Sequence, residues 1–196
     1  MTRAYYFKVF LKTKVNDEDR KLLLVSRSYD GIEKMPDISE FDHTNLAKFN
    51  YDDFNDPDFK DYIDSAIQYS GKYSLRIDSN KIYSSAYKKA FRVLTDKEYA
   101  WIKVTAYIYP TVEFKLSPAS LVITFLHKEW NYKYFTIDFE KQNLKIKEWN
   151  KITAVYMTPE VRNPNDELSV YFWLRGSKTF YVDDLSIDLY EPKEKE

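Results

Sequence analysis

The stretch that decides the fold lies near the C-terminus, where residues 168–176 read LSVYFWLRG and residues 179–189 read TFYVDDLSIDL. Side chains of the first part alternate between an inner apolar set and an outer aromatic set: Leu168, Val170, Phe172 and Leu174, then Tyr171 and Trp173. This two-residue period predicts a β-strand with one buried face. We expect Glu167–Arg175 and Thr179–Leu189 to form a hairpin through residues 175–178, in which Gly176 supplies whatever positive φ the turn needs.

The second of these strands carries two adjacent carboxylates, Asp183 and Asp184. Aspartate is a poor strand former, and one side chain of an adjacent pair must point inward. The inward carboxylate therefore needs compensation, either from a bound cation or from a set of backbone N–H donors. This pair is the sharpest chemical feature of the sequence.

Composition excludes several classes of protein. The 196 residues suffice for one sizeable domain with an appendage, and they include no cysteine and only two histidines, His43 and His127. Disulfides, cysteine-based metal sites and histidine-rich metal sites are thereby excluded. A net charge of −1 argues against a nucleic-acid surface. No run of about 18 uncharged apolar residues exists, so no membrane-spanning segment is expected.

The remaining pattern is that of short strands. Residues 99–109 read YAWIKVTAYIY, in which Ile102, Val104 and Ile108 fall on one side, and a similar alternation places Phe135, Ile137 and Phe139 inside. About eight such strands, spaced 8–12 residues apart, predict an all-β, antiparallel two-sheet jelly-roll sandwich over residues 51–192.

Residues 1–50 are predicted to be an N-terminal extension. Residues 1–30 contain two apolar runs whose periodicity fits either a helix or a hairpin, and the turn-like Asn16–Asp19 slightly favours the hairpin. Residues 31–50 lose periodicity and are expected to form a linker or loop. The domain is then expected to begin with a short acidic strand, Tyr51–Asp56.

Aromatic residues make up 18% of the chain, and several fall on strand faces that alternation leaves outside. These candidate ligand-binding residues are Trp101, Tyr107, Tyr109, Tyr134, Tyr171 and Trp173. A flat ring can stack on the apolar face of a pyranose while neighbouring polar groups bind its hydroxyls. The pattern indicates a polysaccharide or oligosaccharide platform. The alternative is that the rings are covered by residues 1–50 or by a neighbouring domain.

Three ordered motifs resemble the carbohydrate-binding-module-like jelly rolls, which are galactose-binding-like β-sandwich domains. These motifs are Gly71–Ile77 (GKYSLRI), Trp149–Ile152 (WNKI) and Tyr181–Leu185 (YVDDL). The resemblance covers roughly residues 51–190. It implies that Trp149, at the start of a strand where the family keeps a buried aromatic, lies in the core. It implies a non-catalytic accessory domain, outside the cytoplasm, in a larger exported or membrane-attached glycan-related protein with neighbouring domains as partners.

The resemblance also implies a structural Ca²⁺ that joins the first strand to the last. Its ligands would come from Asp53, Asn55 and Asp56 together with Asp183 and Asp184, although Asn55 stands where the family has a glutamate.

Two functions from other classes compete with glycan binding. One is a glycosidase, which needs a pair of carboxylates that no strand-spaced motif here supplies. The other is a structural or protein-interaction domain, such as the exported tail of a membrane glycosyltransferase-like protein.

Overall fold

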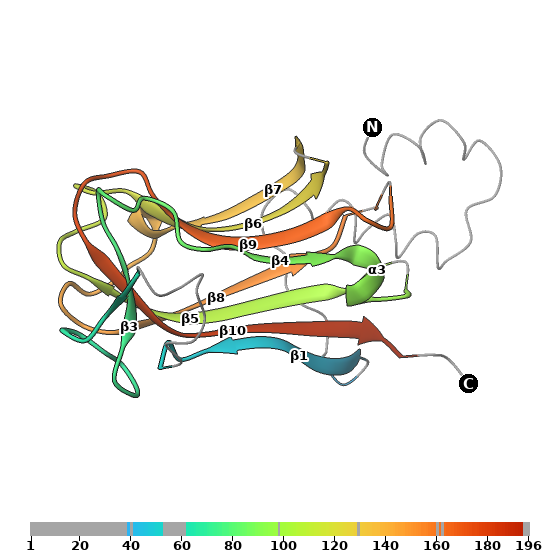
Figure 1. Cartoon of the computed structure of the whole chain (residues 1–196), viewed down its shortest axis with the longest axis horizontal. Helices are drawn as coiled ribbons and strands as arrows, with labels where there is room; N and C mark the ends of the chain where they lie inside the picture. The colour runs from blue at the N-terminus through green and yellow to red at the C-terminus, as the bar shows by residue number, and fades with distance from the viewer. Residues whose placement is uncertain are drawn as a thin grey trace.

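The structure is a computed structural model that describes residues 39, 41–52, 62–97, 99–128, 130–159, 161 and 163–193. Within these ranges, two antiparallel sheets pack face to face (Figure 1). The six-stranded sheet has the order β2-β3-β10-β5-β8, and β1 also pairs with β10. The four-stranded sheet has the order β4-β9-β6-β7. The predicted all-β antiparallel sandwich is confirmed.

The strands of the six-stranded sheet are β1 (Phe41–Phe49), β2 (Ile63–Asp64), β3 (Ser74–Ile77), β5 (Trp101–Pro110), β8 (Asn150–Met157) and β10 (Phe180–Pro192). Those of the four-stranded sheet are β4 (Tyr87–Ala90), β6 (Ala119–His127), β7 (Trp130–Asp138) and β9 (Glu167–Leu174). Two short helical turns, α3 (Phe91–Leu94) and η3 (Phe139–Lys141), follow β4 and β7.

The core lies between the sheets and follows the predicted alternation. Ile102, Val104 and Ile108 of β5 are fully buried, and so are Val170 and Phe172 of β9. Phe139 is also buried, while Phe135 and Ile137 of the edge strand β7 are half-buried and pack against the same cluster. Each buried side chain of this size contributes roughly 1.5–3 kcal/mol of transfer free energy.

The C-terminal strands do not form the predicted hairpin. β9 belongs to the four-stranded sheet and β10 to the six-stranded sheet, so residues 175–179 cross from one layer to the other. Arg175 N and Gly176 N both donate to Pro118 O, at 2.8 and 2.9 Å. Gly176 does not have a positive φ. It is needed for close packing, because a Cβ at this position would lie 2.3 Å from Ser117 Oγ.

The predicted loop over residues 31–50 is wrong for residues 41–49. These residues form β1, which pairs antiparallel with β10 from Phe41–Pro192 to Phe49–Leu185. The strand is an irregular edge strand with a register shift between Asn45 and Ala47 and with mostly exposed side chains, which is why its sequence shows no alternation. The predicted helix or hairpin within residues 1–30 lies outside the described residues.

Candidate functional site

The six aromatic residues predicted to bind a ligand lie in three separate places. Tyr134, Tyr171 and Trp173 point outward from the four-stranded sheet, because their strand neighbours face the core. Tyr107 and Tyr109 point outward from the six-stranded sheet. Trp101 lies on that second face as well, further along β5. The sequence analysis therefore assigned to one platform six residues that lie in separate places in the fold.

Trp101 is not available as a ligand platform. Only 3% of its surface is exposed, because it packs in a small apolar cluster with Phe41, Met157 and Tyr190 on the outer face of the six-stranded sheet. Phe41 belongs to the N-terminal part of the chain that was expected to be a linker. At this position, the alternative in which residues 1–50 cover the outward rings is correct.

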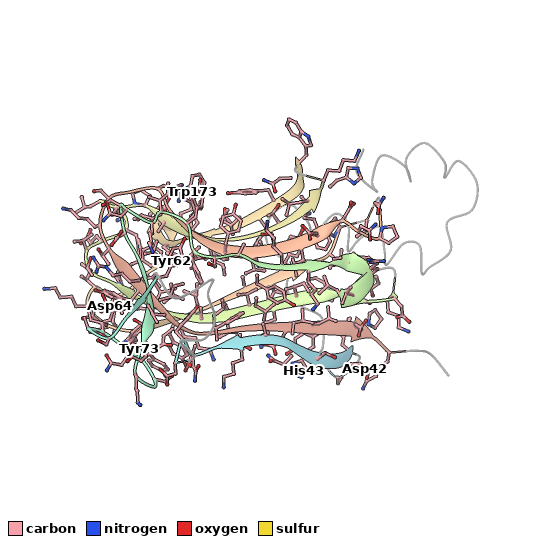
Figure 2. All side chains as sticks on the ribbon, viewed as in Figure 1. Asp42, His43, Tyr62, Asp64, Tyr73 and Trp173 are labelled. Atoms are coloured by element: carbon pink, nitrogen blue, oxygen red, sulfur yellow. The ribbon has the colours of Figure 1, made fainter. Side chains whose placement is uncertain are left out.

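The outer face of the four-stranded sheet carries a group of partly exposed rings, which we call the β9 ring cluster: Tyr83, Tyr134, Tyr171 and Trp173. The rings of Tyr83 and Trp173 are stacked, with centroids 5.8 Å apart and planes at 16°. Tyr171 meets Tyr83 edge-on at 6.1 Å. Tyr83 and Tyr134 are 46% and 48% exposed. Figure 2 shows Trp173 on the side of the molecule formed by this sheet.

Tyr83 is a member of this cluster that the sequence analysis missed. It lies in a segment before β4 that forms an isolated bridge with Trp173. Backbone hydrogen bonds on both sides of it, from Ser84 N to Phe172 O at 3.0 Å and from Leu174 N to Ile82 O at 2.7 Å, fix it against β9. Because only a single bridge is involved, the local sequence has no strand period that could have indicated it.

Small side chains of β6 lie between the ring-bearing strands. Ser120, Val122 and Thr124 point to the same outer face and are nevertheless buried. In register, Ser120 lies between Trp173 and Asp138, Val122 lies beside Tyr171, and Thr124 lies between β9 and Tyr134. The larger side chains of the flanking strands cover this central strand, so side chains of the flanking strands, the rings among them, form the outer surface of this face.

A polar group borders the β9 ring cluster at Trp173. The Arg175 guanidinium lies over the Trp173 ring at 5.7 Å, and its Nη2 donates to Ser120 Oγ at 2.9 Å and to Glu140 Oε1 at 2.5 Å. Asp138 accepts from Lys141 at 2.8 Å and lies 3.3 Å from Arg175. Burial would raise the pKa of Asp138, but hydrogen bonds from Lys141 and Ser120 and the nearby positive charges outweigh it and lower that pKa.

Two tyrosine hydroxyls of the cluster, those of Tyr171 and Tyr134, have a raised pKa and stay protonated at neutral pH. Burial, with smaller effects from Tyr134 and Tyr83, raises the pKa of Tyr171 to about 12. Burial also raises the pKa of Tyr134. The face therefore presents neutral hydroxyl groups, each of which can donate and accept a hydrogen bond.

Tyr107 and Tyr109 belong to a second group of rings, on the opposite sheet. We call it the β5 ring cluster: Tyr69, Tyr107, Tyr109 and Trp149, with the buried Tyr181 beside Tyr109 on the neighbouring strand. The prediction that Trp149 lies in the core is wrong. Its ring lies half-buried on the outer face, and its Nε1 donates to Gln68 O at 3.1 Å. Trp149 lies just before β8 rather than inside the strand, so the alternation of inward and outward side chains does not determine its direction.

The Asp183–Asp184 pair lies where β10 changes partners. Residues 180–182 pair with β3 and residues 185–192 pair with β1, and a register shift against β5 spans the acid pair. Asp183 is fully buried, and its Oδ2 accepts from Tyr69 N at 2.8 Å and Ser70 N at 3.0 Å. Its Oδ1 accepts from Asp184 N at 2.8 Å. Backbone N–H donation, one of the two predicted compensations, is therefore present.

Asp184 lies where β10 changes its pairing partner from β3 to β1, and its backbone is bent there. Its φ is 45°, in the left-handed region that aspartate tolerates better than most residues. Its Oδ1 accepts from Ser70 Oγ at 2.9 Å. Burial is the main reason that the pKa of Asp183 is raised, and the charge of Asp184 adds to it, while the three N–H donors act in the opposite direction.

The calcium site stays a prediction. Asp53, Asn55 and Asp56, its other proposed ligands, lie outside the described residues. In the part of the chain that the structure describes, no group of three or more His, Cys, Asp or Glu side chains gathers as a metal site would require. A calcium ion with six to eight oxygen ligands would thus need the carboxylates of residues 53–56 beside Asp183 and Asp184.

No helix within the described ranges is long and apolar enough to cross a membrane.

No protein-family model matches the sequence, and no curated protein sequence matches it significantly. Solved structures with a similar fold include "Family 16 Carbohydrate Binding Module-2", at 15% identity and a TM-score of 0.41 over 64% of this chain and 82% of that one. The CBM22-1 xylan-binding domain from Paenibacillus barcinonensis Xyn10C matches at 15% identity and a TM-score of 0.42, over 67% of this chain and 81% of that one.

Carbohydrate-binding modules described as members of "the beta-sandwich super family" match at 13% identity and a TM-score of 0.45. That match covers 76% of this chain and 56% of the other. The resemblance to carbohydrate-binding-module-like jelly rolls is thus a resemblance of fold. At these identities and TM-scores, it carries no argument about what this chain binds.

Proposed function

We propose that this domain is a non-catalytic carbohydrate-binding module whose β9 ring cluster binds a neutral polysaccharide or oligosaccharide. The observation that carries the proposal is the stacked pair Tyr83 and Trp173, extended by Tyr171 and Tyr134, on the outer face of the four-stranded sheet. Large rings on an exposed face indicate a binding surface, and flat rings suit the apolar face of a pyranose.

Polar groups at the edge of the cluster suit sugar hydroxyls. Arg175, Glu140 and Asp138 are held to one another beside Trp173 by hydrogen bonds and ion pairs, so they are fixed before a ligand arrives. Since Arg175 and Lys141 balance Asp138 and Glu140, the site offers donors and acceptors without a net charge. A neutral glycan fits such a site better than an acidic one.

The same carboxylates are poorly suited to glycoside hydrolysis. A glycosidase needs one carboxylic acid whose pKa is raised so that it can protonate the leaving group. Here both carboxylates contact the Arg175 guanidinium, and the pKa of Asp138 is lowered. This supports binding without catalysis.

The test is a glycan-array screen of the purified chain, followed by calorimetry with the best neutral ligand. Each stacked ring contributes about 1 kcal/mol, so a site of this kind binds in the high micromolar to millimolar range. Trp173→Ala should weaken binding by about fivefold to tenfold. The matched control is Trp130→Ala, because Trp130 is 79% exposed and lies outside the β9 ring cluster. Equal affinity in the two variants would contradict the location of the site.

A structural or protein-interaction domain is the second candidate, and Trp101 favours it. That ring points outward from its sheet but is covered by Phe41 and its neighbours, so part of the outer surface serves packing rather than ligand binding. Failure of every glycan on the array to bind would support this candidate.

We propose the wider context on the resemblance alone. The domain would belong to an exported or membrane-attached glycan-related protein and would act outside the cytoplasm, beside further domains. Expression of the longer parent chain with a tag, followed by cell fractionation, tests this location.

A further inference from the structure

We propose that the β5 ring cluster is a second, independent binding platform for a neutral glycan, on the opposite face of the sandwich from the β9 ring cluster. This inference deepens the proposed function and relies on it for the class of ligand. Its location rests on a separate set of residues, and the two platforms together would let one domain hold two glycan chains.

The rings of the β5 ring cluster contact one another in a row. Tyr69 and Tyr107 are stacked with centroids 3.7 Å apart and planes at 16°. Trp149 meets Tyr69 at 5.8 Å and Tyr109 at 5.4 Å. Tyr69 is 44% exposed, and Tyr107, Tyr109 and Trp149 are half-buried, so ring surface remains available to a ligand.

The loop that carries Tyr69 is anchored at several points. The buried carboxylate of Asp183 accepts from the backbone N–H groups of Tyr69 and Ser70. Ser70 Oγ donates to Asp184, and the Trp149 indole donates to the carbonyl of Gln68. The position of the Tyr69 ring is therefore set before binding, which lowers the conformational entropy that a ligand would have to remove.

The residues at the base of this loop are fixed in the same way. Asp52 Oδ1 accepts from Lys72 N at 2.7 Å and Tyr73 N at 3.1 Å, next to Gly71. Gly71 has a φ of 63°, and a Cβ there would lie 2.1 Å from the Asp52 carboxylate. The loop is thus built around backbone contacts that leave the Tyr69 side chain on the surface.

Charged groups around the β5 ring cluster largely satisfy one another. Arg76 lies opposite Tyr181 in the register and forms ion pairs with Asp64 at 3.4 Å and with Asp78 at 3.0 Å. Lys151 is exposed and lies opposite Tyr107 on the same face. Mixed charges beside rings provide hydrogen-bond donors and acceptors for hydroxyl groups, with no strong preference for an ionic ligand.

The two platforms cannot be one site. Tyr107 and Tyr109 alternate with Ala106 and Ile108, which are buried between the sheets, and Trp173 alternates with Phe172 and Leu174, which are buried from the other side. The core of the sandwich therefore separates them.

The four tryptophans of the chain provide a direct test, because their indole N–H groups give four NMR signals from four different places. Trp173 reports on the β9 ring cluster and Trp149 on the β5 ring cluster. Buried Trp101 and the exposed Trp130 are controls. The uniformly ¹⁵N-labelled chain would be titrated separately with cellohexaose, xylohexaose and mannohexaose, with the signals assigned from single Trp→Phe variants.

We expect saturable movement of the Trp149 signal with at least one hexasaccharide, and we expect it to persist in Trp173→Ala. Tyr69→Ala should weaken the response of Trp149 by about fivefold and leave that of Trp173 unchanged, whereas Tyr69→Phe should preserve both. Movement of Trp173 alone would overturn the second platform and leave the proposed function standing. Loss of the Trp149 response in Trp173→Ala would also overturn it, because a single site would then explain both signals.

The remaining outcomes are equally decisive. Movement of Trp149 alone would support the second platform and refute the location given for the first. Absence of any movement would refute both, and equal movement of Trp130 would show non-specific contact, which overturns the inference.

Discussion

Replacement of Asp183 by asparagine should destabilise the domain by roughly 2 kcal/mol. Both carboxylate oxygens of Asp183 accept backbone N–H groups, from Tyr69 and Ser70 on one side and from Asp184 on the other. Asparagine has only one acceptor oxygen, so its amide nitrogen must face at least one N–H donor. A buried donor without an acceptor costs about 1–3 kcal/mol, and the remaining bonds lose their charge assistance.

One effect opposes this loss. Burial and the charge of Asp184 raise the pKa of Asp183, so removal of the buried charge recovers part of the free energy. The net value therefore lies inside the range for one unsatisfied donor rather than above it. At about 2–4 °C per kcal/mol for a domain of this size, the melting temperature should fall by roughly 4–8 °C.

Urea denaturation measures the effect, with the midpoint expected to shift and the slope to stay constant. Asp184→Asn is the matched control, since it removes the same charge one residue away. Asp184 is half-exposed and has a φ of 45°, which asparagine tolerates, so its free energy of unfolding should change by less than about 0.5 kcal/mol. If both variants have the same stability, the N–H donation to Asp183 is not what holds this region, and the reasoning fails.

Two further predictions concern stability. If residues 53–56 complete a calcium site with Asp183 and Asp184, millimolar calcium should raise the melting temperature, since a ligand that binds only the native state stabilises it by RT ln(1 + [L]/Kd). Scanning calorimetry with calcium and with EDTA measures this, and an unchanged midpoint would refute the metal site. Trp101→Ala should lower the free energy of unfolding by about 3–5 kcal/mol because the ring is buried. The glycan affinity of the folded molecules should stay the same. Weaker binding at unchanged stability would contradict the packing described for Trp101.

Local alternation explains what could be predicted for the strands. In β5 and β9, every second residue is apolar and buried, so the sequence indicated both the strand and its inner face. β1 has mostly exposed side chains and a register shift, and α3 is a single turn, so neither has enough period to be recognised. Pairing of β1 with β10 joins segments that lie far apart in the sequence, which no local pattern encodes.

The candidate site, like the strands, could be predicted only in part from the sequence. The sequence by itself determined that rings lie on outer strand faces and that an inward carboxylate needs donors, because both follow from alternation and the cost of burying charge. Only the tertiary structure decided which rings meet. It placed β9 and β10 in different sheets, brought Tyr83 to Trp173 through one bridge, and covered Trp101 with Phe41. Such contacts join residues far apart in the chain, and their free energy depends on how the two sheets pack rather than on the residues beside them in the sequence.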